Sequence, residues 1–260
     1  MSNHYHLVLH VDRSRARQWS PNEVVERWTQ LFSAPPLVSR WQNGQADGIE
    51  REAAESIIEG WRARLWDISW FMKCLNEHLA RRANAEDHCT GRFWEGRFRS
   101  QALLDEAGLF TAMAYVDLNP IRAGIAATPE ASEFTSIQQR IRELRQAAVS
   151  TSPTPRLHAF QSPASKSTTA LPSEVQDYLQ LVDWTGRAIR PDKRGAIDSS
   201  LPPILQRLNV DTRAWAVAMT SQGNVFGQAM GRISHLRLHA ATLGQSWVRG
   251  LRQAERMYSR

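Results

Sequence analysis

Two groups of polar side chains, one near the start of the chain and one near its middle, have the types and spacing for metal-assisted chemistry. His4 and His6 are two residues apart, so on a strand both imidazoles would project from one face and could share a metal ion. Tyr115 and Asn119 are four residues apart, which places them one turn above each other on a helix. Taken alone, the first pair is better explained as two surface histidines, and the second as a tyrosine near a helix-ending asparagine. His10 lies on the same face of the expected strand and is a weaker candidate ligand.

The elements that must position these groups are a strand and a helix. His4 to Val11 is rich in residues that favour strands, and Arg92 to Ser100 alternates aromatic with cationic residues. The second stretch is typical either of a strand with solvated arginines or of a surface on which bases stack. Asp105 can cap a helix that carries Tyr115 and ends at Asn119-Pro120.

Further helices are predicted from capping residues and from apolar residues at helical spacing. Ser20-Pro21-Asn22-Glu23 is a capping box at the start of a helix that reaches Phe32, and Asp67 can cap another that ends near Asn84. The remaining predicted helices cover residues 49–65, 136–145, 173–184, a segment capped by Asp211, and much of 226–256.

Composition divides the chain into two modules. Residues 147–172 are dense in Ser, Thr, Pro and Ala, which is typical of a linker between domains at 1–146 and 173–260. The net charge is +6, and residues 151–260 supply the excess, with 14 cationic and 7 anionic side chains. Only three of the 32 cationic side chains are lysines, and guanidinium groups suit phosphate, although a GC-rich genome would give the same bias.

Several classes of protein are excluded by the composition. No apolar run approaches the roughly 18 residues of a membrane helix, and no signal peptide precedes the first strand, so no membrane partner is expected. Two cysteines are too few for a disulfide framework and favour the cytoplasm. There is no Gly-rich phosphate loop.

Three ordered motifs resemble the single-tyrosine transposases of the HUH endonuclease superfamily, in the branch associated with repetitive extragenic palindromes. The motifs are Met-Ser-Asn-His-Tyr-His-Leu-Val at residues 1–8, Gly-Arg-Phe-Trp-Glu-Gly-Arg-Phe at 91–98, and Tyr-Val-Asp-Leu-Asn-Pro-Ile-Arg-Ala-Gly at 115–124. The resemblance covers about residues 1–125. It implies a bacterial mobile-element enzyme that cleaves and rejoins single-stranded DNA at sites flanked by hairpins.

The resemblance also implies a role for each matching residue. Tyr115 matches the nucleophile that forms a 5′-phosphotyrosine, and His4 and His6 match metal ligands, with Asn119 at the position of the third ligand. A free phenol has a pKa near ~10 and is a poor nucleophile at neutral pH until a cation stabilises charge on the phosphate. Two imidazoles and an amide leave coordination positions open, which suits Mg²⁺ or Mn²⁺.

The expected partner is single-stranded or hairpin DNA, with a homodimer as a further possibility that the family implies. The candidate DNA contacts are Arg92, Trp94, Arg97, Arg99 and Arg122, and core packing is the alternative role for Trp94. The basic helical module at 173–260 is expected to add DNA or partner binding.

The fold class expected is α+β, with a small antiparallel sheet and helices forming a ferredoxin-like HUH nuclease core, followed by a mainly α-helical C-terminal module. Family members place a strand, a helix and a strand before the His-x-His strand, whereas this sequence has three residues before His4. The alternative function is therefore a truncated or domesticated DNA-binding remnant without activity, and a replication or conjugation relaxase is a second reading of the same chemistry.

Overall fold

The computed structural model divides the chain into two compact units, Leu9–Arg99 and Met1–Val8 with Ser100–Arg260. The residues that the structure describes are 4–146, 157–161, 170–189, 211, 213–215, 217, 227 and 229–258. Most of the predicted linker and much of the predicted helix capped by Asp211 therefore lie outside the described residues.

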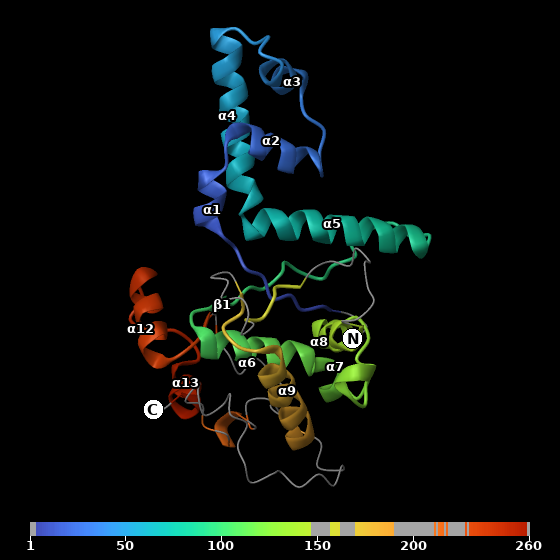
Figure 1. The fold of residues 1–260 in the computed structure, drawn as a ribbon, viewed down its shortest axis with the longest axis vertical. Coiled ribbons are helices and arrows are strands. Elements are labelled where there is room, and N and C mark those ends of the chain that lie inside the picture. Colours follow the sequence, from blue (N-terminus) through green and yellow to red (C-terminus); the bar gives the residue numbers. More distant parts are fainter. Residues whose placement is uncertain are drawn as a thin grey trace. The chain divides into compact units, whose positions relative to one another are not determined.

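The unit Leu9–Arg99 is a helical assembly. Its elements are α1 (Arg13–Gln18), α2 (Pro21–Thr29), α3 (Pro36–Gln42), α4 (Gly48–Leu65) and α5 (Ile68–Glu86) (Figure 1). The predicted capping box at Ser20 is present, since its hydroxyl accepts from the Glu23 amide and the Glu23 carboxylate accepts from the Ser20 amide. Asp67 caps α5 as predicted, although that helix runs past Asn84 to Glu86.

Stacked tryptophans form the centre of this unit. Trp28 of α2 and Trp61 of α4 lie with ring centroids 5.0 Å apart and nearly parallel planes, among buried aliphatic side chains. Arg62 is also buried, and its guanidinium donates to the carbonyl of Ala16 at 3.1 Å and to that of Trp19. These bonds satisfy carbonyls at the end of α1 and hold that short helix against α4.

The second unit is helix-rich with a very small sheet. Its helices are α6 (Glu106–Asp117), α7 (Asn119–Arg122), the 3₁₀ turn η1 (Pro129–Ala131), α8 (Ser136–Gln146), α9 (Val175–Ile189), α12 (Ile233–Thr242) and α13 (Leu251–Met257). The strands are β1 (Ala102–Leu103) and β2 (Ala229–Met230). None of the described helices combines the length and apolar character needed to cross a bilayer.

The sheet corrects the expectation of an antiparallel core. β1 pairs with β2 in parallel, in the register Ala102 with Ala229 and Leu103 with Met230. The predicted strands over His4–Val11 and Arg92–Ser100 are wrong, because the structure gives neither stretch a strand. A strand exists only through hydrogen bonds to a partner strand, and sequence pattern alone does not supply the partner.

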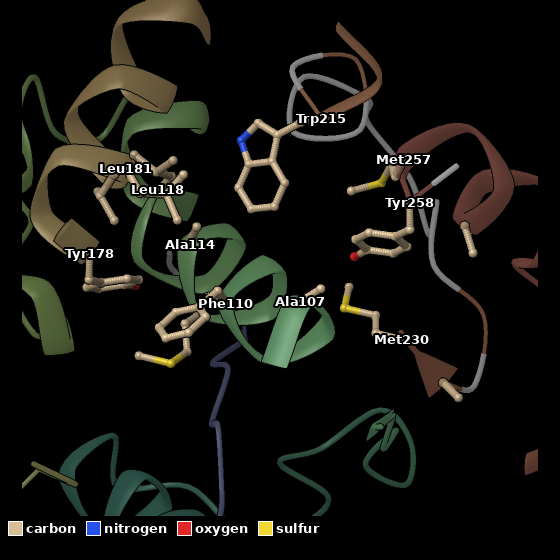
Figure 2. Packing of buried hydrophobic residues seen from close by; sticks show 14 of the residues in the cluster. Ala107, Phe110, Ala114, Leu118, Tyr178, Leu181, Trp215, Met230, Met257 and Tyr258 are labelled. Atoms are coloured by element: carbon tan, nitrogen blue, oxygen red, sulfur yellow. The ribbon is translucent and has the colours of Figure 1, made fainter. Parts of the chain in front are cut away.

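The core of this unit surrounds α6, as Figure 2 shows. Phe110 of α6 and Leu118, the C-cap residue of α6, lie in one cluster with Tyr178 and Leu181 of α9. Trp215 belongs to the same cluster. Helices on both sides of the predicted linker thus share one core. The predicted domains 1–146 and 173–260, and the predicted linker 147–172 between them, stay predictions.

Part of the predicted linker belongs to this core. The ring of Phe160 lies 6.4 Å from that of Phe110 and 5.2 Å from that of Tyr178, centroid to centroid. The guanidinium of Arg140 lies 4.5 Å from the Phe160 ring centroid, and Leu171 is buried. Phe160 and Leu171, which lie within the predicted linker, therefore pack against this core.

A close approach of backbones fixes Gly108 at the start of α6. A Cβ added at this residue would lie 2.7 Å from the carbonyl oxygen of Met230 in β2. Any larger residue would force the helix away from the strand. Asp105 caps α6 as predicted and also accepts from the Arg232 amide, so one carboxylate joins the helix to the segment after β2.

Tyr258 gives a pH-dependent contribution to stability. Burial is the main cause that raises its pKa to about 12, and its hydroxyl shares a hydrogen bond of 2.8 Å with Thr111 of α6. Below pH 10 the phenol is neutral in both states, whereas between about 10 and 12 it ionises only in the unfolded state. We expect the free energy of unfolding to fall by about 2–3 kcal/mol over this range because of this group.

Urea denaturation at several alkaline pH values measures this effect. The variant Tyr258→Phe has no ionisable group at this position and is expected to lose less stability than the wild type between about pH 10 and 12. Equal losses in the two proteins would show that Tyr258 does not carry the alkaline dependence.

Candidate active site

The helix break between α6 and α7 places Tyr115 and Asn119 beside each other. α6 ends at Asp117, and Pro120 takes the second position of α7, where its missing amide proton is no loss. The backbone continues with little deviation, because the Arg122 amide donates to the carbonyl of Leu118 at 3.0 Å. Both candidate side chains are half-buried.

The two histidines of the first motif lie at this turn. Nε2 of His6 is 3.0 Å from the side-chain amide nitrogen of Asn119, and the ring of His6 is 6.1 Å from that of Tyr115, centroid to centroid. The rings of His4 and His6 are 5.2 Å apart and nearly perpendicular. The structure thus brings together four residues that the chain separates by more than a hundred positions.

A cation completes the cluster. The guanidinium carbon of Arg122 lies 4.4 Å from the centroid of the Tyr115 ring, in a cation–π contact. Burial, followed by the charges of His4 and Arg122, lowers the pKa of His6 below its ordinary value. A lowered pKa keeps the imidazole neutral over more of the physiological range, and the neutral form is the one that binds metals.

The residues present fit a divalent ion with open coordination positions. Two ligand atoms in neighbouring positions on an octahedral ion, each at about 2.1 Å, are about 3 Å apart. This is the separation between His6 Nε2 and the end of the Asn119 amide, whose oxygen and nitrogen are interchangeable by a flip of the side chain. Within the described residues no three His, Cys, Asp or Glu side chains lie together as a metal site, so the candidate set depends on the amide.

No family model, curated protein or solved structure matches this chain. The assignment of the cluster rests therefore on its own geometry and on the motifs of the sequence.

Among the candidate DNA contacts, Arg122 lies in the unit that holds Tyr115, and the others lie in the unit Leu9–Arg99. Arg97 and Arg99 are exposed, while the guanidinium of Arg92 donates to the backbone carbonyls of Trp94, at 2.8 Å, and Glu95. The indole N–H of Trp94 donates to the carbonyl of Asn76 in α5 at 3.0 Å. Trp94 is half-buried, so part of its surface packs within the unit, and its contact with DNA stays a prediction.

Asp117 is not among the predicted site residues. It lies between Tyr115 and Asn119 in the sequence, but on the opposite side of the helix. Its carboxylate is buried and accepts from Tyr178 Oη at 2.5 Å, from Ser136 Oγ at 2.6 Å and from the Ile137 amide at 3.1 Å. Burial, followed by the neighbouring carboxylate, raises the pKa of Tyr178 well above its ordinary value, so the phenol remains the donor. Asp117 joins the site turn to α8 and α9.

Proposed function

We propose that this protein is a transposase that cleaves and rejoins single-stranded DNA at sites flanked by hairpins, through a 5′-phosphotyrosine intermediate. The observation that carries the proposal is the convergence of Tyr115 with His6, His4, Asn119 and Arg122. A phenol beside two imidazoles, an amide and a guanidinium is the donor set that phosphoryl transfer to tyrosine needs. The sequence motifs that resemble HUH transposases support the same reaction.

Each side chain has a distinct part in this reaction. The Tyr115 phenol gives up its proton as its oxygen attacks the phosphorus atom, and the bond from phosphorus to the 3′-oxygen breaks. The departing oxygen takes up a proton and becomes a 3′-hydroxyl, so no proton is gained or lost overall. Arg122 is placed to bind the negative phosphate and to offset the charge that develops there. His4, His6 and Asn119 would hold a divalent ion, Mg²⁺ or Mn²⁺, which supplies Lewis-acid polarisation of a phosphate oxygen when bound.

Rejoining is the reverse reaction with another strand. A 3′-hydroxyl attacks the phosphotyrosine, the new phosphodiester forms, and the Tyr115 phenol is released with its proton. The intermediate conserves the energy of the phosphodiester, so the exchange needs no nucleotide cofactor. The strands must stay bound during the exchange, and Arg122 beside the phenol is placed to bind phosphate in both steps.

A second candidate function is DNA binding without catalysis. One observation favours it: His4 and His6 lie on a segment that forms no strand in the described structure, and Leu7 and Val8 beside them are exposed. Catalytic groups act best from rigid supporting elements, and an unpaired segment is a poor support.

A covalent-adduct assay separates the two candidates. The full-length protein is incubated with Mg²⁺ and a 3′-labelled DNA hairpin that has single-stranded flanks of randomised sequence, and then denatured and separated on a gel. We expect a labelled protein band in the wild type and its complete loss in Tyr115→Phe, because the 5′ phosphate of the labelled fragment is attached to this phenol.

Tyr5→Phe is the matched control, because Tyr5 is the tyrosine between the two histidines. This variant is expected to keep the adduct. An adduct that persists in Tyr115→Phe would contradict the assigned nucleophile. A wild-type protein that binds the hairpin and gives no adduct would support DNA binding without catalysis.

A further inference from the structure

The end of α4 and the beginning of α5 gather cations on the faces of tryptophans. Arg13 of α1 lies 4.6 Å from the centroid of the Trp66 ring. Arg64 and Lys73 lie 4.5 and 4.9 Å from the centroid of one ring, that of Trp70. We call these five residues the α4–α5 corner. Figure 1 shows α1 along the end of α4 from which α5 begins.

The unit Leu9–Arg99 is rich in cation–π contacts. Globular proteins show roughly one energetically significant cation–π contact per 70–80 residues. The unit Leu9–Arg99 has five contacts between a cation and a tryptophan ring, and three of them belong to the corner. Because two like charges share the Trp70 ring, they also repel each other, and an anion between or beside them would remove that cost.

Five of the ten arginines on the helices of this unit form an ion pair with a glutamate, and the cations of the corner do not. Arg51 and Arg81 each pair with a glutamate one turn away. In the described part of the chain, Arg13, Arg64 and Lys73 form no ion pair with a carboxylate, and all three are exposed.

Two acidic residues adjoin the corner in the sequence, Asp12 beside Arg13 and Asp67 beside Trp66, and among the described residues neither forms an ion pair. The Asp12 carboxylate accepts from the Arg15 amide at 2.9 Å and caps α1. The Asp67 carboxylate accepts from the amides of Ser69 and Trp70 at 2.6 and 3.1 Å, and so caps α5. The corner therefore presents three exposed cations without an ion pair, over the faces of half-buried indole rings.

We infer that the α4–α5 corner binds single-stranded nucleic acid. Lysine and arginine contact the phosphate backbone, and aromatic faces with guanidinium planes stack on unpaired bases, which together make the recognition surface of proteins that bind single strands. That the bound strand is DNA rests on the proposed function. The assigned binding surface lies in the unit Leu9–Arg99, apart from the residues of the Tyr115 cluster.

Binding of a labelled oligothymidylate to the full-length protein, measured by fluorescence anisotropy, tests this inference. All proteins carry Tyr115→Phe and are assayed without divalent ions, so no strand is cleaved. The variant Arg64→Gln/Lys73→Gln is expected to raise the Kd about tenfold, and to reduce the slope of log Kd against log salt by about 1.4, because each lost contact with a single strand accounts for about 0.7.

The matched control removes the same amount of charge from the same two helices. Arg51→Gln/Arg81→Gln loses two exposed arginines that are already paired, and we expect its Kd to change less than about twofold. The charge-preserving variant Arg64→Lys/Lys73→Arg is expected to bind within about threefold of the parent and with its salt slope. Circular dichroism of each variant confirms that the helices are retained.

The outcomes distinguish this inference from the proposed function. Equal weakening in Arg64→Gln/Lys73→Gln and in the control would overturn the inference, whether or not the wild type forms a Tyr115 adduct. Weakening confined to Arg64→Gln/Lys73→Gln would support it even if no adduct formed. Binding of the parent to vesicles of anionic phospholipid, with no binding to the oligonucleotide, would assign the corner to a membrane surface and overturn it as well.

Discussion

The double variant His4→Ala/His6→Ala is expected to cleave single-stranded DNA about a thousandfold more slowly than the wild type. Loss of both imidazoles leaves only the Asn119 amide to hold a divalent ion, and Lewis-acid stabilisation of the transition state is worth several kcal/mol. Single-turnover cleavage with excess protein and saturating Mg²⁺ measures the chemical step. Binding of Mn²⁺, followed by electron paramagnetic resonance, gives a readout independent of catalysis and should be lost in the same variant.

His10→Ala is the control for this prediction. His10 belongs to the unit Leu9–Arg99, whereas His4 and His6 belong to the unit that holds Tyr115. We expect His10→Ala to retain both Mn²⁺ binding and the cleavage rate. Cleavage at the wild-type rate in His4→Ala/His6→Ala would show that these histidines do not hold the ion.

Helix starts are predictable from this sequence because their chemistry is local. Ser20, Asp67 and Asp105 each accept from amides two or three residues ahead, so both partners of every bond lie within one short stretch of sequence. The predicted helices over 49–65 and 136–145 are confirmed within one residue at each end. Antiparallel strands were expected at His4–Val11 and Arg92–Ser100, and neither is present.

The strands were mispredicted because their pairing is not local. Ala102 and Leu103 pair with residues 229–230, more than a hundred positions away, and neither stretch has an extended alternating pattern. Each strand has two residues, so its stability comes from the packing of α6 against β1 and β2 rather than from β propensity. The sequence alone therefore gives no physical reason to pair these two strands.

The residues of the candidate site were predictable from the sequence, whereas the contacts that hold them in place were not. The motifs named His4, His6, Tyr115 and Asn119, and the structure places all four at one turn, while their roles stay predictions. Nothing near Asp117 in the sequence indicates that it is buried. Its partners follow 19, 20 and 61 residues later, and only the packing of α8 and α9 on α6 brings them to the carboxylate.

The variant Asp117→Ala is expected to lower the free energy of unfolding by about 3–5 kcal/mol. Three donors converge on this buried carboxylate, and its removal leaves the hydroxyl of Tyr178, the hydroxyl of Ser136 and the amide of Ile137 without their partner. The carboxylate also lies at the N-terminus of α8, where the helix dipole favours negative charge. Urea denaturation followed by circular dichroism measures the change.

A functional effect should accompany the loss of stability, because Asp117 holds the turn between Tyr115 and Asn119 from behind. Tyr178→Phe removes one of the three donors and keeps the carboxylate, so it should cost less, about 1–2 kcal/mol, and retain adduct formation. Glu133→Ala removes an exposed carboxylate from the same unit, and its stability should change by less than about 0.5 kcal/mol. If Asp117→Ala were as stable as Glu133→Ala, the carboxylate would not be what fixes the site turn to α8 and α9, and the geometry of the Tyr115 cluster would need another cause.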